Sequence, residues 1–183
     1  MNFHPTPPHI VEIIRRHIPK RKITNILEPA AGEGALLGAL RKPLCNSCEL
    51  VLLDIDNFKC ELLRNISKQA HVINNDFLQH DFKDSKFDLI ITNPPFSGRS
   101  EDWIDTSLGK APLEGAFILK CLSLLSENGT LIAIVPDSLV NSIRHRKFRE
   151  IFFEFNLKYC YQLPEKTFPR TEGRLMTMVV APK

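Results

Sequence analysis

Two residue patterns alternate along this chain and limit the folds open to it. Short apolar runs rich in β-branched residues, typical of buried strands, are followed by stretches with the apolar spacing of helices. Such alternation indicates βαβ units, and therefore an α/β fold with a mostly parallel sheet and helices on both faces. The strand-like runs are Thr24–Leu27, Leu50–Leu53, His71–Asn74, Phe87–Ile91 and Thr130–Val135, with two more near 157–163 and 174–180. Helical patterns lie near 10–18, 34–41, 57–67, 112–126 and 143–154, and the sequence Glu127-Asn128-Gly129 predicts the stop of the fourth.

Length and composition set further bounds. With 183 residues, 43% of them hydrophobic, the chain can bury one core, and we expect residues 1–183 to form a single domain. No apolar run approaches the roughly 20 residues of a membrane span, and the N-terminal stretch lacks the order of a signal peptide. Five scattered cysteines fit a reducing compartment, so we expect a cytoplasmic protein with no membrane partner. The net charge of +3 permits a polyanionic partner without requiring one.

An isolated CxxC pair, Cys45 and Cys48, is the one metal-like motif. A zinc site needs a second cysteine pair or histidines at ligand spacing, and His71 and His80 are not so arranged. We therefore expect no metal site.

Polar and glycine-rich segments follow the first three predicted strands. Glu28 precedes a loop with Gly32 and Gly34, which let a ligand approach the backbone closely, although a tight strand-to-helix turn would use the same residues. Glu28 repels phosphate and suits a cationic ligand. Asp54 ends the second strand, where an acid can bind ribose hydroxyls. Asp76 follows the third and could accept from an exocyclic amine, with the neighbouring Phe77 on an adenine face.

The fourth strand is followed by Asn93-Pro94-Pro95-Phe96. Prolines end ladder pairing, because each lacks an N–H group. A proline turn, however, needs neither an amide before it nor an aromatic ring after it. Because ligands bind beyond the carboxyl ends of parallel strands, this motif and the preceding acids are expected at one edge of the sheet.

Together these segments resemble the class I S-adenosylmethionine-dependent methyltransferases, and within them the N6-adenine DNA methyltransferases found in type I and type II restriction systems. The resemblance covers nearly the whole chain, from "PTPPHIVEII" through "LEPAAGEG", "DID", "NDF" and "NPPF" to "TFPRTEGRLMTMVV". It implies a Rossmann-like, seven-stranded, mostly parallel sheet with a C-terminal antiparallel hairpin. It also implies S-adenosylmethionine (SAM) as cofactor, held by Thr6, Pro7, Glu28, Pro29, Ala30, Gly32, Gly34, Asp54, Ile55, Asp76, Phe77 and Asn93.

The resemblance gives the "NPPF" motif a chemical role in methylating an amino group. An exocyclic amine is a poor nucleophile, because its lone pair is delocalised into the ring. The side-chain oxygen of Asn93 and the carbonyl of Pro94 can accept its two N–H groups, while Pro94 and Pro95 keep these acceptors rigid. Phe96 would stack on the base and Phe168 would form a second wall, so a base in a duplex must flip out. No Pro-Cys dipeptide is present for attack on cytosine C5.

A basic run, "RHRKFR", follows the fifth strand. On the active edge, Arg144, Arg146 and Arg149 could contact nucleic-acid phosphates, although such a run is often a solvated helix face. Phe168 could equally be a core residue of the hairpin.

The chain departs from the family in one respect: we find no separate target-recognition domain. Three explanations are open. The chain recognises a short target sequence or none, or a partner or specificity subunit supplies the recognition, or the substrate is not duplex DNA. Four functions remain open: DNA N6-adenine methylation, RNA methylation at guanine N2 or adenine N6, protein-glutamine N5 methylation, and a catalytically silent partner subunit. Tyrosine at the last motif position, typical of the glutamine enzymes, is absent here, and the intact motifs argue against a silent subunit.

Overall fold

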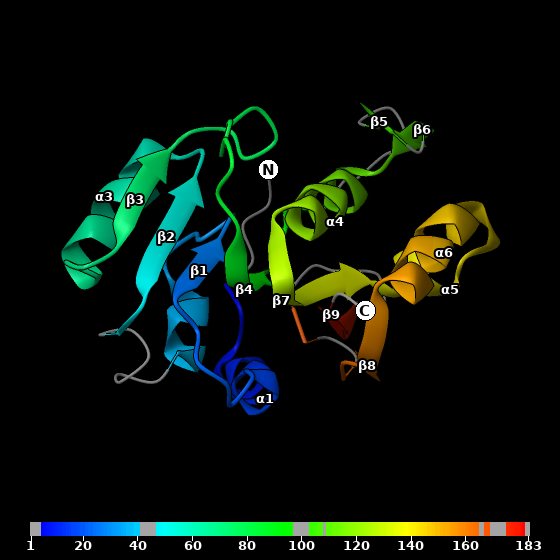
Figure 1. Ribbon diagram of the computed structural model, residues 1–183, viewed down its shortest axis with the longest axis horizontal. Helices are drawn as coiled ribbons and strands as arrows, with labels where there is room; N and C mark the ends of the chain where they lie inside the picture. Colours follow the sequence, from blue (N-terminus) through cyan, green and yellow to red (C-terminus); the bar gives the residue numbers. More distant parts are fainter. Residues whose placement is uncertain are drawn as a thin grey trace.

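The computed structural model describes residues 5–40, 47–96, 103–107, 109–164, 167–168 and 175–181. Its main sheet has the strand order β3-β2-β1-β4-β7-β9-β8 (Figure 1). The first five of these strands are parallel to one another, whereas β9 is antiparallel to both β7 and β8. The bounds are β1 Asn25–Glu28, β2 Glu49–Asp54, β3 His71–Asn74, β4 Phe87–Thr92, β7 Leu125–Pro136, β8 Asn156–Gln162 and β9 Leu175–Ala181. The prediction of a Rossmann-like, mostly parallel sheet is confirmed.

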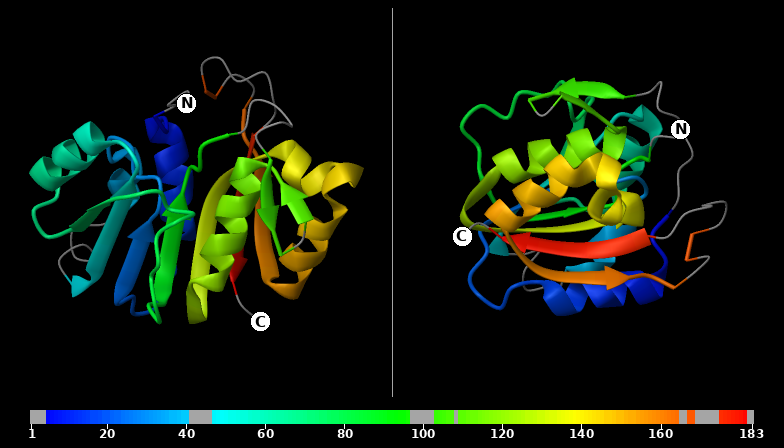
Figure 2. Two further views of the ribbon diagram at one scale, coloured as in Figure 1. Left: turned by 90° about the horizontal axis from the view of Figure 1, so that it is seen from above. Right: turned by 90° about the vertical axis from the view of Figure 1, so that its right-hand side faces the viewer.

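Helical elements cover both faces of this sheet (Figure 2). On one face lie α1 (Pro8–His17), the short 3₁₀ helix η1 (Ala35–Ala39) and α3 (Asn57–Ile66). On the other lie α4 (Leu113–Ser123), α5 (Asp137–Asn141) and α6 (Arg146–Glu154), with the 3₁₀ turn η3 (Ile143–His145) between the last two. Alternate strand residues serve the two cores: Leu89 and Ile91 pack with α1, and Ile90 packs with α4. None of the helices within the described ranges is long and apolar enough to cross a membrane.

Two predicted helices differ from those observed. The helix expected near 34–41 is the shorter η1, preceded by Gly34 in a left-handed conformation (φ +80°). The helix expected over 112–126 ends at Ser123, and the predicted stop at 127–129 lies inside β7. A Cβ atom at Gly129 would lie 2.9 Å from the carbonyl oxygen of Phe87 on β4. Gly129 therefore permits close approach of two strands at a register shift rather than ending a helix.

A second, smaller sheet follows the "NPPF" motif, in a stretch for which the sequence predicted no strand. Ile104–Thr106 (β5) and Gly109–Ala111 (β6) pair as an antiparallel two-stranded sheet. Gly109 adopts φ +95°, and the Thr106 hydroxyl donates to its carbonyl oxygen at 2.6 Å. α4 then begins at Leu113, close to the start expected for the helix near 112–126. This segment thus brings a small sheet and the first turn of α4 next to the carboxyl end of β4.

Candidate cofactor and catalytic site

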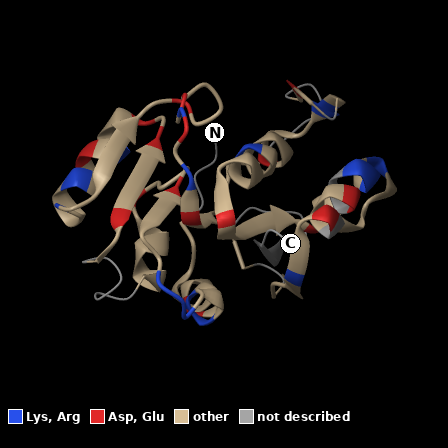
Figure 3. Cartoon of the chain, viewed as in Figure 1, with Lys and Arg blue, Asp and Glu red and all other residues tan. Residues whose placement is uncertain are grey.

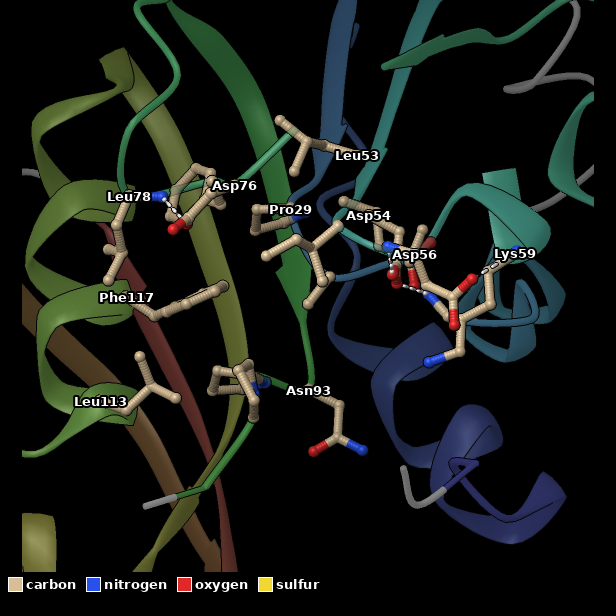
Figure 4. Close-up of a pocket in the computed structure, with 18 of the residues that line it drawn as sticks. Pro29, Leu53, Asp54, Asp56, Lys59, Asp76, Leu78, Asn93, Leu113 and Phe117 are labelled. Carbon is tan, nitrogen blue, oxygen red and sulfur yellow. Dashed lines mark hydrogen bonds between the residues drawn. The ribbon is translucent and has the colours of Figure 1, made fainter. Parts of the chain in front are cut away.

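A cavity of about 1140 Å³ lies at the carboxyl ends of the parallel strands. Its lining comes from the loops after β1, β2 and β3, from the residues after β4, and from α4. Figure 4 shows Asp54 and Asp56 on one side of it, with Asp76, Leu78 and Phe117 on the other. Acidic positions, coloured red on the ribbon, also lie near these strand ends in Figure 3. The sequence prediction that these strand ends share one site is therefore consistent with the geometry. Of the predicted cofactor residues, the cavity is lined by Thr6, Glu28, Pro29, Ala30, Gly32, Asp54, Ile55, Asp76, Phe77 and Asn93.

The loop after β1 is fixed to β2 by hydrogen bonds. Gly32 donates its N–H to Asp54 Oδ2 at 2.7 Å, and Ala31 donates to the Leu53 carbonyl at 2.9 Å. Gly32 and Gly34 both have positive φ, of 57° and 80°, which favours glycine. A Cβ on Gly34 would lie 2.8 Å from Cδ1 of Ile66 on α3, so this position needs glycine for space as well. Gly34 supports the loop without lining the cavity.

Asp54 connects two loops of the site. Its buried carboxylate accepts from Gly32 through Oδ2 and from the N–H of Asp56 through Oδ1, at 2.9 Å. Asp56 in turn caps α3 by accepting from the N–H groups of Phe58 and Lys59. Each carboxylate oxygen has a second lone pair, so a ligand hydroxyl can share Asp54 with these amides. Ile55, next in sequence, is 60% exposed and lines the cavity.

Glu28 is the most deeply buried acid of the site, at 1% exposure. Among the described residues, its Oε2 atom is buried and has no hydrogen-bond partner. Burial, and secondarily the negative charge of Asp54, raise the pKa of Glu28 well above its ordinary value. A cationic group in the cavity would offset both effects. The carboxylates of Glu28 and Asp54 therefore fit the positively charged SAM and not an anionic nucleotide.

The loop after β3 packs on α4. Asp76 Oδ1 accepts from the N–H of Leu78 at 2.9 Å. Phe77 is buried, with its ring centroid 4.9 Å from that of Phe117 on α4. Lys120, one helical turn further on α4, donates to the carbonyl oxygens of Leu78 and His80 at 3.1 and 2.6 Å. Phe77 therefore belongs to the core on the α4 side and is also one of the residues that line the cavity.

All four residues of the "NPPF" motif line the cavity. Asn93 Nδ2 donates to the hydroxyl of Thr6 at 3.2 Å, so the N-terminal segment fixes one end of this amide. In Figure 4 its nitrogen is turned toward α1 and its oxygen away from it. Phe96 is half-buried and packs against the core on the α1 side of the sheet. Pro7 lies outside the lining and is the N-cap residue of α1, where its carbonyl accepts from Ile10 and Val11.

The predicted substrate residues lie outside the cavity lining. Phe168 is 1% exposed and belongs to the core on the α1 side, which Phe96 also contacts, so the structure favours the core role for it. Arg144 and Arg146 follow β7, and Arg146 Nε lies 2.9 Å from Glu150 Oε1. Arg149 is in α6, but its side chain lies outside the described residues. Of the CxxC pair, Cys45 also lies outside them, and no cluster of metal ligands occurs in the described part of the chain.

Sequence analysis missed several residues of the lining. Leu113 and Phe117 extend from α4, Ile104 comes from β5, and Lys59 lies in the first turn of α3. The signal for Phe117 was present, because Leu113 and Phe117 lie four residues apart on an apolar helix beside the site. Ile104 lies in a strand that the sequence analysis did not predict.

The sheet order, the helices on both faces and the site at the strand ends are those of the Rossmann-like methyltransferase fold. The methyltransferase subunit of the type I restriction-modification system of Streptococcus thermophilus superposes with a TM-score of 0.82 at 17% identity, covering 100% of this chain and 46% of that subunit. The chain belongs to the Eco57I restriction-modification methylase family, whose profile matches residues 36–168.

Two curated relatives agree with this assignment. The type II methyltransferase M.CvrRI of Paramecium bursaria Chlorella virus XZ-6E is 36% identical over 180 residues, which is 96% of this chain and 47% of that protein. The type II methyltransferase M.TthHB8I of Thermus thermophilus is 31% identical over 148 residues, 72% of this chain and 33% of that protein. The chain thus spans less than half of the length of these two curated relatives.

Proposed function

We propose that this chain transfers the methyl group of SAM to the exocyclic N6 of adenine in DNA. The observation that carries the proposal is the position of Asn93. Its amide is anchored on Thr6 in the same cavity that Glu28 and Asp54 line. Amine acceptors and a cofactor site thereby share one space, as transfer to an amino group requires. The relatives named type II methyltransferases support DNA as the substrate.

In this proposal the cofactor lies across the carboxyl ends of β1, β2 and β3. Asp54 accepts the ribose hydroxyls beside its two amide donors, Asp76 accepts from the adenine amine, and Ile55 covers the adenine ring. Thr6 and Glu28 are left for the methionine end, where Glu28 faces the positive charges of the ligand. Bound SAM would supply an electrophilic methyl group.

The residues after β4 orient the target amine. The Asn93 side-chain oxygen and the Pro94 carbonyl accept its N–H groups, and the nitrogen lone pair then points into the cofactor cavity. Pro94 and Pro95 hold both acceptors, so little reorganisation is needed when the amine becomes positively charged. Phe96 stacks on the adenine ring. No strong general base is required, since the methylated nitrogen loses its extra proton readily.

A base in a duplex reaches such a cavity only after it flips out of the stack. Arg144, Arg146 and Arg149, after β7, are proposed to contact phosphates next to the flipped nucleotide. Of these, Arg144 is exposed, while Arg146 forms an ion pair with Glu150.

The proposal treats residues 1–183 as one catalytic unit with the family's seven-stranded sheet and C-terminal antiparallel hairpin. The antiparallel pairing of β8 with β9 supports that architecture. Target recognition is proposed to come from additional polypeptide or a specificity subunit, because the matched relatives are at least twice as long as the segment they share with this chain.

One experiment tests the reaction and the substrate together. The protein is incubated with tritiated SAM and, separately, duplex DNA, single-stranded DNA and RNA, and each acceptor is digested to nucleosides. We expect labelled N6-methyldeoxyadenosine. Label in RNA alone would replace the substrate, and no label in any acceptor would favour a silent subunit. Asn93→Ala should keep cofactor binding and lose transfer, whereas transfer by this variant would disprove the role of Asn93.

A further inference from the structure

Ile143 is an exposed aliphatic residue that neither core nor cavity uses. Among the described residues it is the most exposed large hydrophobic side chain, at 86%. Single exposed aliphatic residues are common on soluble proteins and need no function. Ile143 differs from them in how firmly its backbone is held and in the charges beside it.

The turn that carries Ile143 is fixed on both sides. η3 comprises only three residues between α5 and α6. The Ser142 hydroxyl oxygen accepts from the N–H of Arg144 at 3.2 Å, and His145 Nδ1 lies 3.0 Å from the Ser138 carbonyl oxygen. The side chain of Ile143 therefore projects from a turn of defined shape.

Arg144 connects this turn to the wall of the cavity. Its guanidinium carbon lies 4.2 Å from the centre of the Trp103 ring, and the His145 ring lies 5.6 Å from the same ring. Trp103 is seven residues past Phe96 and directly precedes Ile104, which lines the cavity. A cation on an aromatic face is held without losing its charge. Arg144 is thus positioned close to the mouth of the site and remains able to bind an anion.

The surroundings of Ile143 favour a polyanion as the partner. Arg144 and Lys147 are exposed. Arg146 and Lys147 are the first two residues of α6, and this end of the helix is blue in Figure 3. Glu150 forms its ion pair with Arg146 and not with Arg144. An apolar tip between cations matches the stacked bases and flanking phosphates of a duplex.

We propose that Trp103, Ile143 and Arg144 form a duplex-contact ridge. Arg144, held on Trp103, binds a backbone phosphate, and Ile143 enters the base stack beside the target nucleotide. An inserted aliphatic side chain supports the stack that a flipped base leaves behind, so it lowers the cost of flipping. This inference rests on the proposed function, and it predicts a requirement that duplex DNA has and single-stranded DNA lacks.

The test compares methyl transfer to unmethylated plasmid DNA with transfer to the same DNA after heat denaturation. Ile143→Ser should lower transfer to the duplex by about tenfold or more and transfer to denatured DNA by less than about twofold. Ile143→Leu should retain duplex transfer, because it keeps an aliphatic tip. Cofactor affinity, measured by calorimetry, should match wild type in both variants. Equal loss on both substrates, or no loss on either, would overturn the proposal.

A second measurement does not depend on turnover. Binding of a fluorescent random-sequence duplex is followed by anisotropy for Arg144→Met, Trp103→Leu and the double variant, with Lys158→Met on β8 as the matched cation control. We expect Arg144→Met and Trp103→Leu each to weaken binding by about threefold to tenfold, and the double variant to add little, since Trp103 acts through Arg144. If wild type methylated neither DNA form, the proposed function would be wrong, while unchanged duplex binding by Arg144→Met would reject the ridge.

Discussion

Lys120 Nζ donates to the carbonyl oxygen of His80 at 2.6 Å and joins α4 to the loop after β3. The same ammonium group donates to Leu78 and lies 5.2 Å from the centre of the Phe77 ring. Since Leu78 and Phe77 both line the cavity, one lysine behind the site fixes the loop that is proposed to hold the adenine of the cofactor. α4 thereby contributes to the site from two successive turns.

Lys120→Met should weaken SAM binding about tenfold and lower the free energy of unfolding by about 1–3 kcal/mol, because two carbonyl groups lose a charged donor. Calorimetric titration measures the first quantity, and urea unfolding the second. Lys110→Met, at an exposed lysine on β6, is the control. A normal cofactor affinity in Lys120→Met would show that the loop keeps its shape without this contact.

Glu28 should make the stability of the ligand-free protein depend on pH. Its pKa is raised in the folded state above the ordinary value of 4.5, so the folded chain binds a proton more tightly than the unfolded chain. Stability from this group is therefore present at and below that value and is lost as pH rises toward the raised pKa. We expect Glu28→Gln to be more stable than wild type at pH 8, by about 1–3 kcal/mol, and the difference to shrink at pH 5.

The same variant should lose SAM affinity by more than about tenfold, since a neutral amide does not attract a cationic ligand. SAM binding to wild type should also release protons, which is measured by titration in buffers of different ionisation enthalpy. Glu33→Gln, at the exposed acid of the same loop, should change neither quantity. An unaltered affinity in Glu28→Gln would remove Glu28 from the cofactor site.

Thr6→Val should slow methyl transfer, because valine keeps the shape of threonine but cannot accept from Asn93 Nδ2. The Asn93 amide then loses an anchor, and we expect kcat to fall by about tenfold. Thr6→Ser restores the hydroxyl and should recover most of the rate. Single-turnover transfer at saturating SAM separates this effect from cofactor binding. Equal rates for the valine and serine variants would contradict it.

Gly34→Ala should be destabilising for two separate reasons, a φ of +80° and a clash with Ile66 Cδ1 at 2.8 Å. The left-handed conformation costs a non-glycine residue about 1–2 kcal/mol. Gly34→Ala combined with Ile66→Ala should recover only the steric part, since the backbone conformation is unchanged. Gly38→Ala, with its nearest contact at 3.3 Å, should cost less. Urea unfolding of these three variants and of wild type distinguishes these contributions.

The strand positions and the edge of the site could be predicted from sequence because they depend on local patterns. β3 was predicted at its observed bounds, and the residues after β1 to β4 line one cavity because parallel strands end on the same side. Gly129 was misread because glycine both stops helices and permits close strand approach, and only the position of the Phe87 carbonyl decides between them.

Other features depend on contacts between distant residues. Nothing near Phe168 in the sequence indicates its burial beside α1. The carboxylate of Asp54 was predicted to bind a ribose, and its bonds to two backbone amides became visible only with β1 and β2 side by side. Lys120 lies 40 and 42 residues from the two carbonyl groups it binds, and no pattern in α4 marks it.

The two amides that donate to Asp54 have a consequence for how the site forms. The first loop takes its shape only when β2 is already paired beside β1, because the acid that holds Gly32 stands at the end of β2. An incompletely folded chain therefore has the residues of the site without its geometry. A cofactor added during refolding would therefore stabilise only those chains whose central strands are already paired.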